Sequence, residues 1–300
     1  MEQEIHKPVM LMEVLEYLNP QPGATIVDAT LGMGGHSTQI LQGISPEGRL
    51  IGIDRDQESI RLAQERLAEA GQTNAQFVYG NFSDIDILLK DLNVDSVDGI
   101  LFDLGVSSFQ LQNAERGFSF QSEGPLDMRL DRNSYICAYD LINNLNEEEI
   151  SSLLWSFGEE RWHNRIAHNL VMERQRHPIS STLELSRIVV SAIPPRYRRY
   201  HYRIHPATRT FQAVRIAVNR ELEALESAIT KSIGLLKQGG RLCIISFHSL
   251  EDRVVKHTFR KYQAEGTIKI ITTKPLTPGS PEIQDNPRSR SAKFRVAEKV

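Results

Sequence analysis

The chain has 300 residues, of which 40% are hydrophobic and 24% are charged, and its formal net charge is -3. This composition is typical of a globular protein with one large domain or two modest ones. The net charge argues against a protein whose whole surface is positively charged. No apolar run approaches the roughly 18 residues of a membrane span, and the N-terminal residues lack a signal-peptide pattern, so we expect a cytoplasmic protein. Cys137 and Cys243 have no metal-ligand spacing, so neither a disulfide framework nor a metal site is expected.

The first elements along the chain predict a glycine turn between two strands. After a helix over 8–18 come a strand over 25–29, a run with three glycines in four positions at 32–35, and a strand over 49–54. Glycines tolerate positive φ and let the backbone pass close to a ligand. Asp54 ends the second strand, where an acidic side chain can hold the two hydroxyls of a ribose. We therefore predict a nucleoside site at this turn.

The same alternation of strands and helices continues through strands at 75–79 and 97–103, then stops and resumes with a helix over about 207–236 and a strand over 241–247. Alternation of this kind predicts parallel strands joined by right-handed crossovers. The expected fold class is α/β, with a doubly wound, mostly parallel, Rossmann-like sheet.

The interrupting segment, residues 112–206, is expected to be an inserted all-helical domain for substrate recognition. Asn146 with Glu149, and Ser181 with Glu184, have the spacing of a cap answered by a carboxylate three residues later. Residues 1–111 and 207–300 then form the cofactor-binding catalytic domain.

The C-terminal strands help to choose the nucleoside. Alternating patterns at 267–272 and 293–297 predict two antiparallel edge strands joined by a long loop, an ending typical of methyltransferases that use S-adenosylmethionine. Ser37 stands where the dinucleotide fingerprint has its third glycine, so a nicotinamide dinucleotide fits poorly. S-adenosylmethionine has no phosphates. Its site needs a carboxylate that binds the ribose hydroxyls, but it does not need a site that binds phosphate. The simpler alternative is that the glycines only make a tight turn.

Several long strings then point to one family. They are residues 6–11, 103–108, 116–120, 124–129, 205–219, 246–253 and 286–292. These strings resemble those of the bacterial small-subunit (16S) ribosomal RNA (cytosine-N4)-methyltransferases, the RsmH or MraW family, over essentially the whole chain. The resemblance implies an S-adenosylmethionine-dependent enzyme that methylates the N4 amine of a cytosine in the decoding region of small-subunit ribosomal RNA. The substrate is expected within an assembled or assembling small subunit, away from membranes, and a homodimer is left open.

The resemblance also implies a set of cofactor-binding residues: Gly34, Gly35, His36, Asp54, Phe82, Asp103 and Gln110. The first three would line the amino-acid end of the cofactor, and Phe82 would pack near the adenine. Asp54, Phe82 and Asp103 lie at or just beyond the C-terminal ends of predicted strands, where open parallel sheets bind ligands. For His36, a capping or packing role is the alternative.

Two residues are candidates for catalysis. The exocyclic amine of cytosine is a poor nucleophile, so a hydrogen-bond acceptor on its N–H groups would orient it and could take the released proton. Other amino-group methyltransferases carry Asp/Asn/Ser-Pro-Pro-aromatic after the fourth strand, whereas this chain has Asp-Leu-Gly-Val at 103–106. Asp103 is the first candidate, with a purely cofactor-binding role as the alternative. His248 is the second, and it could instead be a helix-start residue bonded to neighbouring backbone.

Substrate contacts are expected in and around the inserted domain, from Phe118, Phe120, Asp127, Arg129, Arg196, Arg198, Arg199, Arg203 and Arg209. Residues 196–203 interleave cations with aromatics, which suits the phosphates and unstacked bases of single-stranded RNA. Residues 288–295 form a second basic cluster, and a solvated charged surface is the alternative for both. Phe118 or Phe120 could support a flipped base, with Asp127 and Arg129 at the entrance, or could pack between domains.

Two other function classes stay open from the residues alone. A non-catalytic RNA-binding assembly factor that kept the cofactor fold would be expected to have lost the glycine turn or the ribose carboxylate, and both are present here. A nicotinamide-dependent oxidoreductase is the weaker alternative, because the third glycine is absent.

Overall fold

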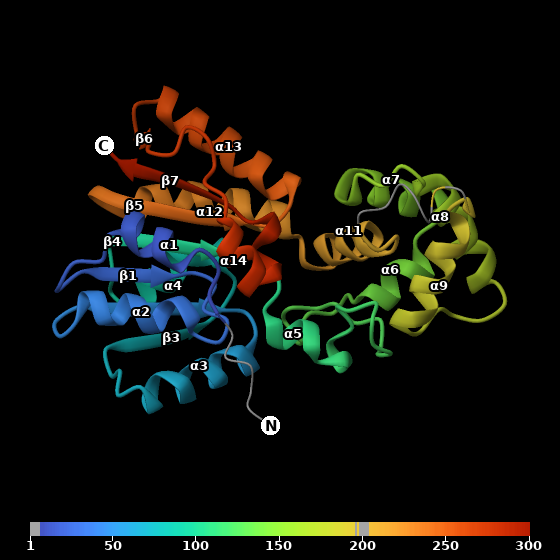
Figure 1. Ribbon diagram of the computed structural model, residues 1–300, viewed down its shortest axis with the longest axis horizontal. Coiled ribbons are helices and arrows are strands. Elements are labelled where there is room, and N and C mark those ends of the chain that lie inside the picture. Colours follow the sequence, from blue (N-terminus) through green and yellow to red (C-terminus); the bar gives the residue numbers. More distant parts are fainter. Residues whose placement is uncertain (1–6, 196, 198–203) are drawn as a thin grey trace. The chain divides into compact units, whose positions relative to one another are not determined.

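The computed structural model describes residues 7–195, 197 and 204–300, and these divide into two compact units (Figure 1). One unit comprises the described residues up to 105 together with 222–300, and we call it the sheet unit. The other comprises the described residues between 106 and 221, and we call it the helical unit.

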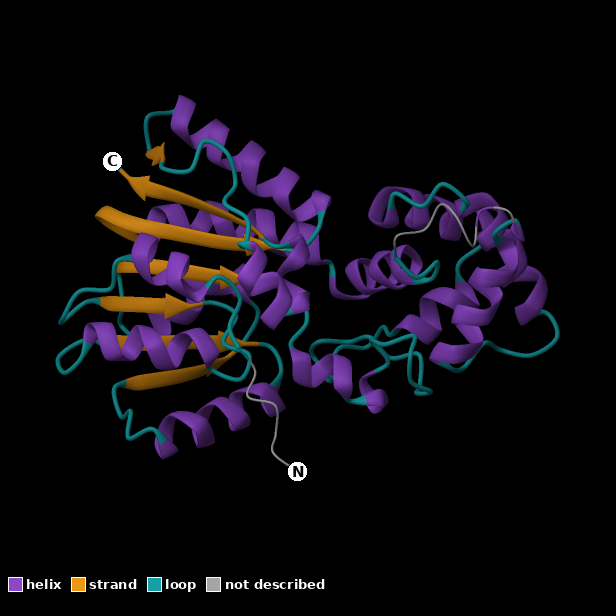
Figure 2. Ribbon diagram, in the orientation of Figure 1, coloured by secondary structure: helices purple, strands orange, loops and turns teal. Residues whose placement is uncertain are grey.

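The sheet unit contains a seven-stranded sheet in the order β3-β2-β1-β4-β5-β7-β6 (Figure 2). Its strands are β1 (Thr25–Asp28), β2 (Arg49–Asp54), β3 (Ala75–Tyr79), β4 (Val97–Asp103), β5 (Leu236–Ser246), β6 (Ile268–Ile270) and β7 (Lys293–Lys299). β1 to β5 run parallel, whereas β7 is antiparallel to both β5 and β6. The doubly wound, mostly parallel sheet predicted from the sequence is confirmed.

Helices cover both faces of this sheet. They are α1 (Leu11–Leu18), α2 (Gly35–Ile44), α3 (Gln57–Glu69), α4 (Ile85–Asp91), α12 (Glu221–Leu235) and α13 (Ser249–Ala264). Adjacent residues of one strand enter different cores: Ile100 packs with α4, α12 and α13, and Leu101 packs with α1 and α2. Strands that are buried on both faces read as continuous apolar runs, which is why the sequence located them.

The long loop expected between the last two strands holds two short helices, α14 (Ser280–Asp285) and the 3-10 helix η3 (Pro287–Ser291). Each has a proline in its first two positions, where the missing N–H has no intrahelical partner to lose.

The helical unit is built from α5 (Ser108–Gln112), α6 (Ala138–Asn144), α7 (Glu147–Gly158), α8 (His163–Arg174), α9 (Thr182–Ala192) and α11 (Thr208–Asn219). Both predicted caps are present: Asn146 and Glu149 form a capping box, and the Ser181 side chain accepts a hydrogen bond from the Glu184 N–H. The unit has one apolar core of its own.

The single helix predicted over about 207–236 is wrong. The structure breaks it at Arg220, which has a φ of 48°, into α11 and α12. Phe211 and Val214 of α11 are buried in the core of the helical unit. The unit therefore spans 106–221, whereas the predicted insert spans 112–206.

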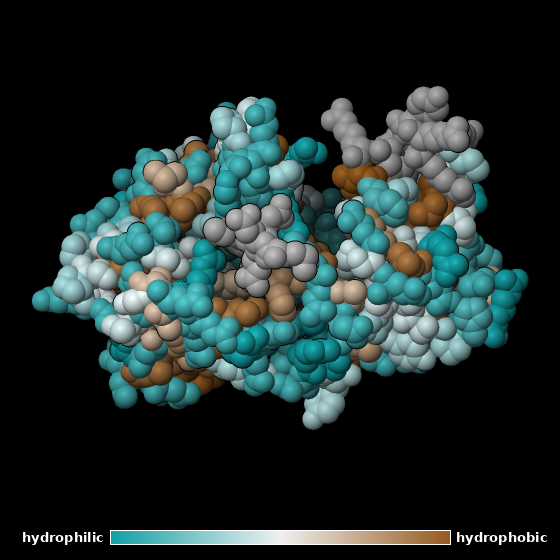
Figure 3. All heavy atoms as spheres, turned by 60° about the horizontal axis from the view of Figure 1, so that its bottom comes forward, coloured by the Kyte–Doolittle hydropathy of each residue, from teal (hydrophilic) through white to brown (hydrophobic). Residues whose placement is uncertain are grey.

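No helix among the described residues is long and apolar enough to cross a bilayer. On the face drawn in Figure 3, hydrophobic residues form separate patches between hydrophilic ones.

Candidate active site

The glycine turn joins β1 to α2 at the C-terminal edge of the sheet. Gly32 and Gly34 have φ values of 50° and 73°, in the left-handed region that glycine adopts without strain. Gly34 is the N-cap of α2, and Gly35 is its first residue. The turn is thus the close-approach backbone that the sequence predicted.

Asp54 is held by the backbone at the end of β2. Its Oδ2 accepts a hydrogen bond from the Gly32 N–H at 2.8 Å, and its Oδ1 accepts one from the Asp56 N–H at 2.9 Å. Burial raises the pKa of this carboxyl to about 6. A carboxylate offers about four lone-pair sites, so two backbone bonds leave room for two hydroxyl donors.

Phe82 begins the 3-10 helix η1 (Phe82–Asp84), just after β3. Its ring meets Phe102 edge-to-face with centroids 5.6 Å apart, and the Arg55 guanidinium lies 5.9 Å from its centroid. The ring is therefore fixed by the core beside the end of the sheet, in a position suited to packing against a flat base.

Asp28 is a buried carboxylate that the sequence reasoning missed. Its Oδ2 accepts a hydrogen bond from the Ser37 hydroxyl at 2.7 Å, and its Oδ1 accepts one from the Thr30 N–H at 3.3 Å. Burial raises its pKa to about 6. Thr30 in turn accepts a bond from the Asp103 N–H at 2.6 Å, which ties the end of β1 to the end of β4. An acidic residue at a strand end before a glycine turn was the available signal.

Asp103 and His36 face each other at this edge. Asp103 Oδ2 lies 3.6 Å from His36 Nδ1, while Asp103 Oδ1 is buried with no hydrogen-bond partner among the described residues. Burial raises the pKa of Asp103 well above its usual range, and the nearby carboxyls of Asp28 and Glu251 add to the shift. An unsatisfied buried acceptor is costly, so this oxygen is available to a donor on a ligand.

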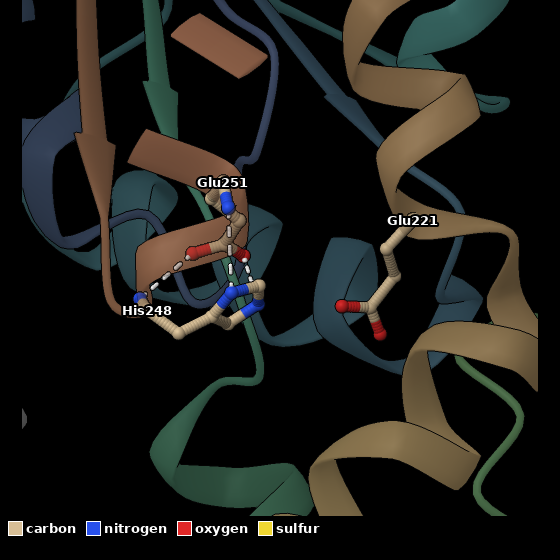
Figure 4. Close-up of side chains that lie close together, drawn as sticks. All are labelled: Glu221, His248 and Glu251. Carbon is tan, nitrogen blue, oxygen red and sulfur yellow. Dashed lines mark hydrogen bonds and ion pairs between the residues drawn. The ribbon is translucent and has the colours of Figure 1, made fainter. Parts of the chain in front are cut away.

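His248 caps α13. Its Nδ1 accepts a hydrogen bond from the Glu251 N–H at 3.3 Å, and the Glu251 carboxylate accepts bonds from the Phe247 and His248 N–H groups. Figure 4 shows the His248 and Glu251 side chains turned toward each other, with Nε2 3.2 Å from Glu251 Oε1. The imidazole thus makes contacts at the helix start, in keeping with a capping role for this residue.

Gln110 belongs to the helical unit, where it answers Ser107 in a capping box at the start of α5. Its Oε1 accepts a hydrogen bond from the Ser107 N–H at 2.9 Å. This contact fixes the side chain of the last residue in the expected cofactor set.

The expected substrate residues lie at several places in the helical unit. Phe118 is buried in its core, whereas Phe120 stacks on His205 with centroids 4.5 Å apart. Asp127 and Arg129 form a two-point ion pair with N–O distances of 2.8 and 2.9 Å. Arg209, which is half-buried, donates to the Glu159 carbonyl at 2.7 Å.

The four remaining arginines of the expected set lie outside the described residues: Arg196, Arg198, Arg199 and Arg203.

Arg116 is a further residue that the sequence reasoning did not single out. Its side chain is fully buried and donates to the carbonyls of Arg129 and Leu130. Asn219 supports the same loop by donating to the Met128 carbonyl at 2.7 Å and accepting from the Leu130 N–H at 2.8 Å. Together they hold the segment that carries the Asp127–Arg129 pair.

We expect Arg116→Ala to lower the free energy of unfolding of the helical unit by about 2 to 5 kcal/mol, because a fully buried side chain is removed and the Arg129 and Leu130 carbonyls lose their donor. Urea unfolding followed by tryptophan fluorescence measures this, since both tryptophans, Trp155 and Trp162, lie in this unit. Arg132→Ala, at an exposed arginine of the same loop, is the control. Equal stability of the two variants would contradict a structural role for Arg116.

The residues at the sheet edge fit S-adenosylmethionine. The glycine turn offers close backbone, Asp54 offers acceptors for ribose hydroxyls, and Phe82 offers a fixed ring after the third strand. The antiparallel β7 beside β5 completes the sheet order of the class. Fold and site define a class I, S-adenosylmethionine-dependent methyltransferase.

The chain belongs to the MraW methylase family, which matches residues 3–300. Three relatives are each named ribosomal RNA small subunit methyltransferase H. The one from Halothermothrix orenii is 47% identical over 310 residues, covering 98% of both chains. The one from Geobacter sulfurreducens is 49% identical over 310 residues, covering 98% of this chain and 99% of the relative. The one from Trichlorobacter lovleyi is 48% identical over 316 residues, covering both chains completely. The family resemblance found in the sequence is confirmed.

Proposed function

We propose that this protein transfers a methyl group from S-adenosylmethionine to the N4 amine of a cytosine in the decoding region of small-subunit ribosomal RNA. The substrate is the RNA within an assembled or assembling small subunit in the cytoplasm. The observation that carries this proposal is the match over the whole chain to relatives named as methyltransferases of that RNA. The intact glycine turn and ribose carboxylate favour an enzyme over an assembly factor that lacks catalysis.

The cofactor, when bound, supplies an activated methyl group, so the chain's own residues have to bind, orient and remove a proton. Gly34, Gly35 and His36 would line the amino-acid end of the cofactor, and Asp54 would hold the ribose. The remaining members of the set are Phe82, Asp103 and Gln110.

Asp103 is the proposed acceptor for the amine. Its Oδ1 is buried, has no partner among the described residues, and lies at the C-terminal end of β4. Accepting a hydrogen bond from the amine would direct the nitrogen lone pair toward the methyl group and give the released proton a place to go.

The direct test is to incubate the protein with labelled S-adenosylmethionine and either free ribosomal RNA or assembled small subunits. The modified base is then mapped by nuclease digestion and mass spectrometry. We expect label on the N4 atom of one cytosine. Label in protein alone would overturn the proposal, and binding of NAD in preference to S-adenosylmethionine would favour an oxidoreductase.

We expect His248→Ala to reduce turnover more than cofactor affinity if the imidazole acts on the substrate. The substitution also removes an N-cap, at a cost of about 1 kcal/mol in stability. His248→Asn separates these effects, because asparagine is a good N-cap without an imidazole. Turnover is measured under saturating cofactor. If His248→Asn has wild-type turnover, the role of His248 is capping. If both variants lose turnover equally, the imidazole takes part in the reaction.

We expect RNA affinity to fall with salt at a log-log slope of about -0.7 for each phosphate contact made by the arginines of residues 196–203. Filter binding between low and physiological salt measures the slope, and alanine at Arg203 should reduce it by one such step. Arg176→Ala, at an exposed arginine of the helical unit paired with Glu173, is the matched control. A salt-independent affinity would argue against phosphate contacts.

A further inference from the structure

The N-terminal segment 7–10 is attached to α14, almost the whole chain away. The Met10 N–H donates to Glu282 Oε1 at 2.7 Å, and Asn286 Nδ2 donates to the Lys7 carbonyl at 3.2 Å. Lys7 also pairs with Asp285 at 2.5 Å, although both of these side chains are exposed. Of these contacts, the bond to Glu282 is the one that reaches a buried residue, because Met10 is 1% exposed.

The same segment contacts His36. The Val9 carbonyl lies 2.9 Å from His36 Nε2. A carbonyl oxygen can only accept a hydrogen bond, so Nε2 must carry the hydrogen in this contact. In a neutral imidazole the other nitrogen then carries no hydrogen and can act only as an acceptor. That nitrogen, Nδ1, is the one 3.6 Å from Asp103 Oδ2.

Glu282 and His36 hold the two sides of one peptide group. The Val9 carbonyl and the Met10 N–H belong to the same planar unit and point in opposite directions across it. A carboxylate that accepts from the N–H therefore fixes the direction of the carbonyl, and a hydrogen bond to a charged acceptor is stronger than a neutral one. Met10 has a φ of 52°, so without this bond the turn has little intrinsic preference for its present backbone geometry.

We propose that Glu282 is a positioning residue which, through the peptide between Val9 and Met10, holds His36 as its Nε2–H tautomer with Nδ1 as an acceptor facing Asp103. Its catalytic consequence rests on the proposed function. A proton that leaves the methylated amine for the Asp103 carboxylate can be shared with Nδ1, so the carboxylate is not left as an isolated buried acid. The carbon–nitrogen bond forms and the carbon–sulfur bond breaks before this proton is passed on.

The first test reads the tautomer directly and needs no substrate. The full chain is labelled with ¹⁵N-histidine, and long-range ¹H–¹⁵N spectra are recorded, with His36 assigned by its absence in His36→Gln. We expect a protonated Nε2 and an unprotonated Nδ1 in the wild-type protein. Glu282→Ala should shift both nitrogens toward a mixture of tautomers. Glu282→Gln should restore the wild-type signals, because its amide oxygen can still accept from the Met10 N–H.

Asp285→Asn is the matched control, since it weakens the exposed contact of the same helix with Lys7. We expect the His36 signals to be unchanged in this variant. A protonated Nδ1 in the wild-type protein would overturn the inference, and this result does not depend on whether any variant folds. Unchanged His36 signals in a folded Glu282→Ala variant would overturn it as well.

The second test measures methyl transfer. Glu282→Ala should lower kcat by about tenfold to a hundredfold with a smaller effect on the KM for RNA, because a catalytic group displaced by about 1 Å can cost that much. Glu282→Gln should stay close to wild type. An equal loss in Gln and Ala would contradict the positioning role. If the wild-type protein methylates no ribosomal RNA, the proposed function fails, whereas the tautomer experiment still decides the role of Glu282.

Discussion

Replacing Asp103 with alanine is expected to abolish methyl transfer. The carboxylate is the buried acceptor at the end of β4, its Oδ1 has no partner among the described residues, and its loss removes both the orientation of the amine and the proton acceptor. A positioned acid or base typically contributes 10² to 10⁴ in rate, so kcat should fall by about that factor. Tritium transfer to small subunits at saturating cofactor measures kcat, and titration with S-adenosylmethionine measures the Kd separately.

Asp103→Asn sharpens the test, because the amide keeps an acceptor oxygen but cannot take up a proton near neutral pH. A large fall in kcat with a nearly unchanged Kd would support proton transfer. A change confined to the Kd would assign Asp103 to the cofactor alone. Asp98→Asn is the matched control: Asp98 lies near the opposite end of the same strand, where it accepts from the Thr25 N–H and pairs with Lys237. Wild-type turnover in Asp103→Ala would remove the residue from the mechanism.

The sheet was predictable because its signals are local. Each buried strand is a short apolar run, and the turn between β1 and α2 needs glycine at its left-handed positions. The roles proposed for Asp54 and Phe82 follow from that order, since the C-terminal ends of parallel strands meet at one edge. These elements required no knowledge of contacts between distant residues.

The break between α11 and α12 was not predictable in this way. The helical pattern runs through 207–236 without glycine or proline at the break, and Arg220 takes a left-handed backbone that arginine rarely adopts. Phe211, on α11, is buried in the core of the helical unit, so α11 packs with that unit and the chain turns at Arg220 before α12 begins. Tertiary packing decided the boundary between the two units.

Buried polar contacts between distant residues escaped prediction for the same reason. An arginine is usually expected at the surface, yet Arg116 is buried and donates to two carbonyls of the loop that follows it. Glu282 accepts a hydrogen bond from Met10, which lies 272 positions away in the chain. The burial of Asp28 depends on the hydrogen bonds that Ser37 and Thr30 donate to its carboxylate, and the folded structure brings these donors to it. No periodicity encodes such pairs.

The affinity for S-adenosylmethionine is expected to fall as the pH drops below 6. Burial raises the pKa of Asp54 to about 6, so below that pH the free protein carries the protonated carboxyl. Ribose hydroxyls donate to the ionised form and favour it, so the pKa falls on binding and a proton is released. The Kd should therefore rise by about tenfold per pH unit below 6 and be independent of this group above it.

Calorimetric titrations near pH 5.5, in buffers of different ionisation enthalpy, count the released proton. Asp54→Asn should bind more weakly at neutral pH and lose most of this pH dependence, because its amide does not titrate. Asp28→Asn is the matched control: Asp28 also has a pKa raised to about 6, but its oxygens bind Ser37 and Thr30. The slope should persist in Asp28→Asn. A slope lost there and kept in Asp54→Asn would show that Asp28 titrates, and the ribose role of Asp54 would lose its support.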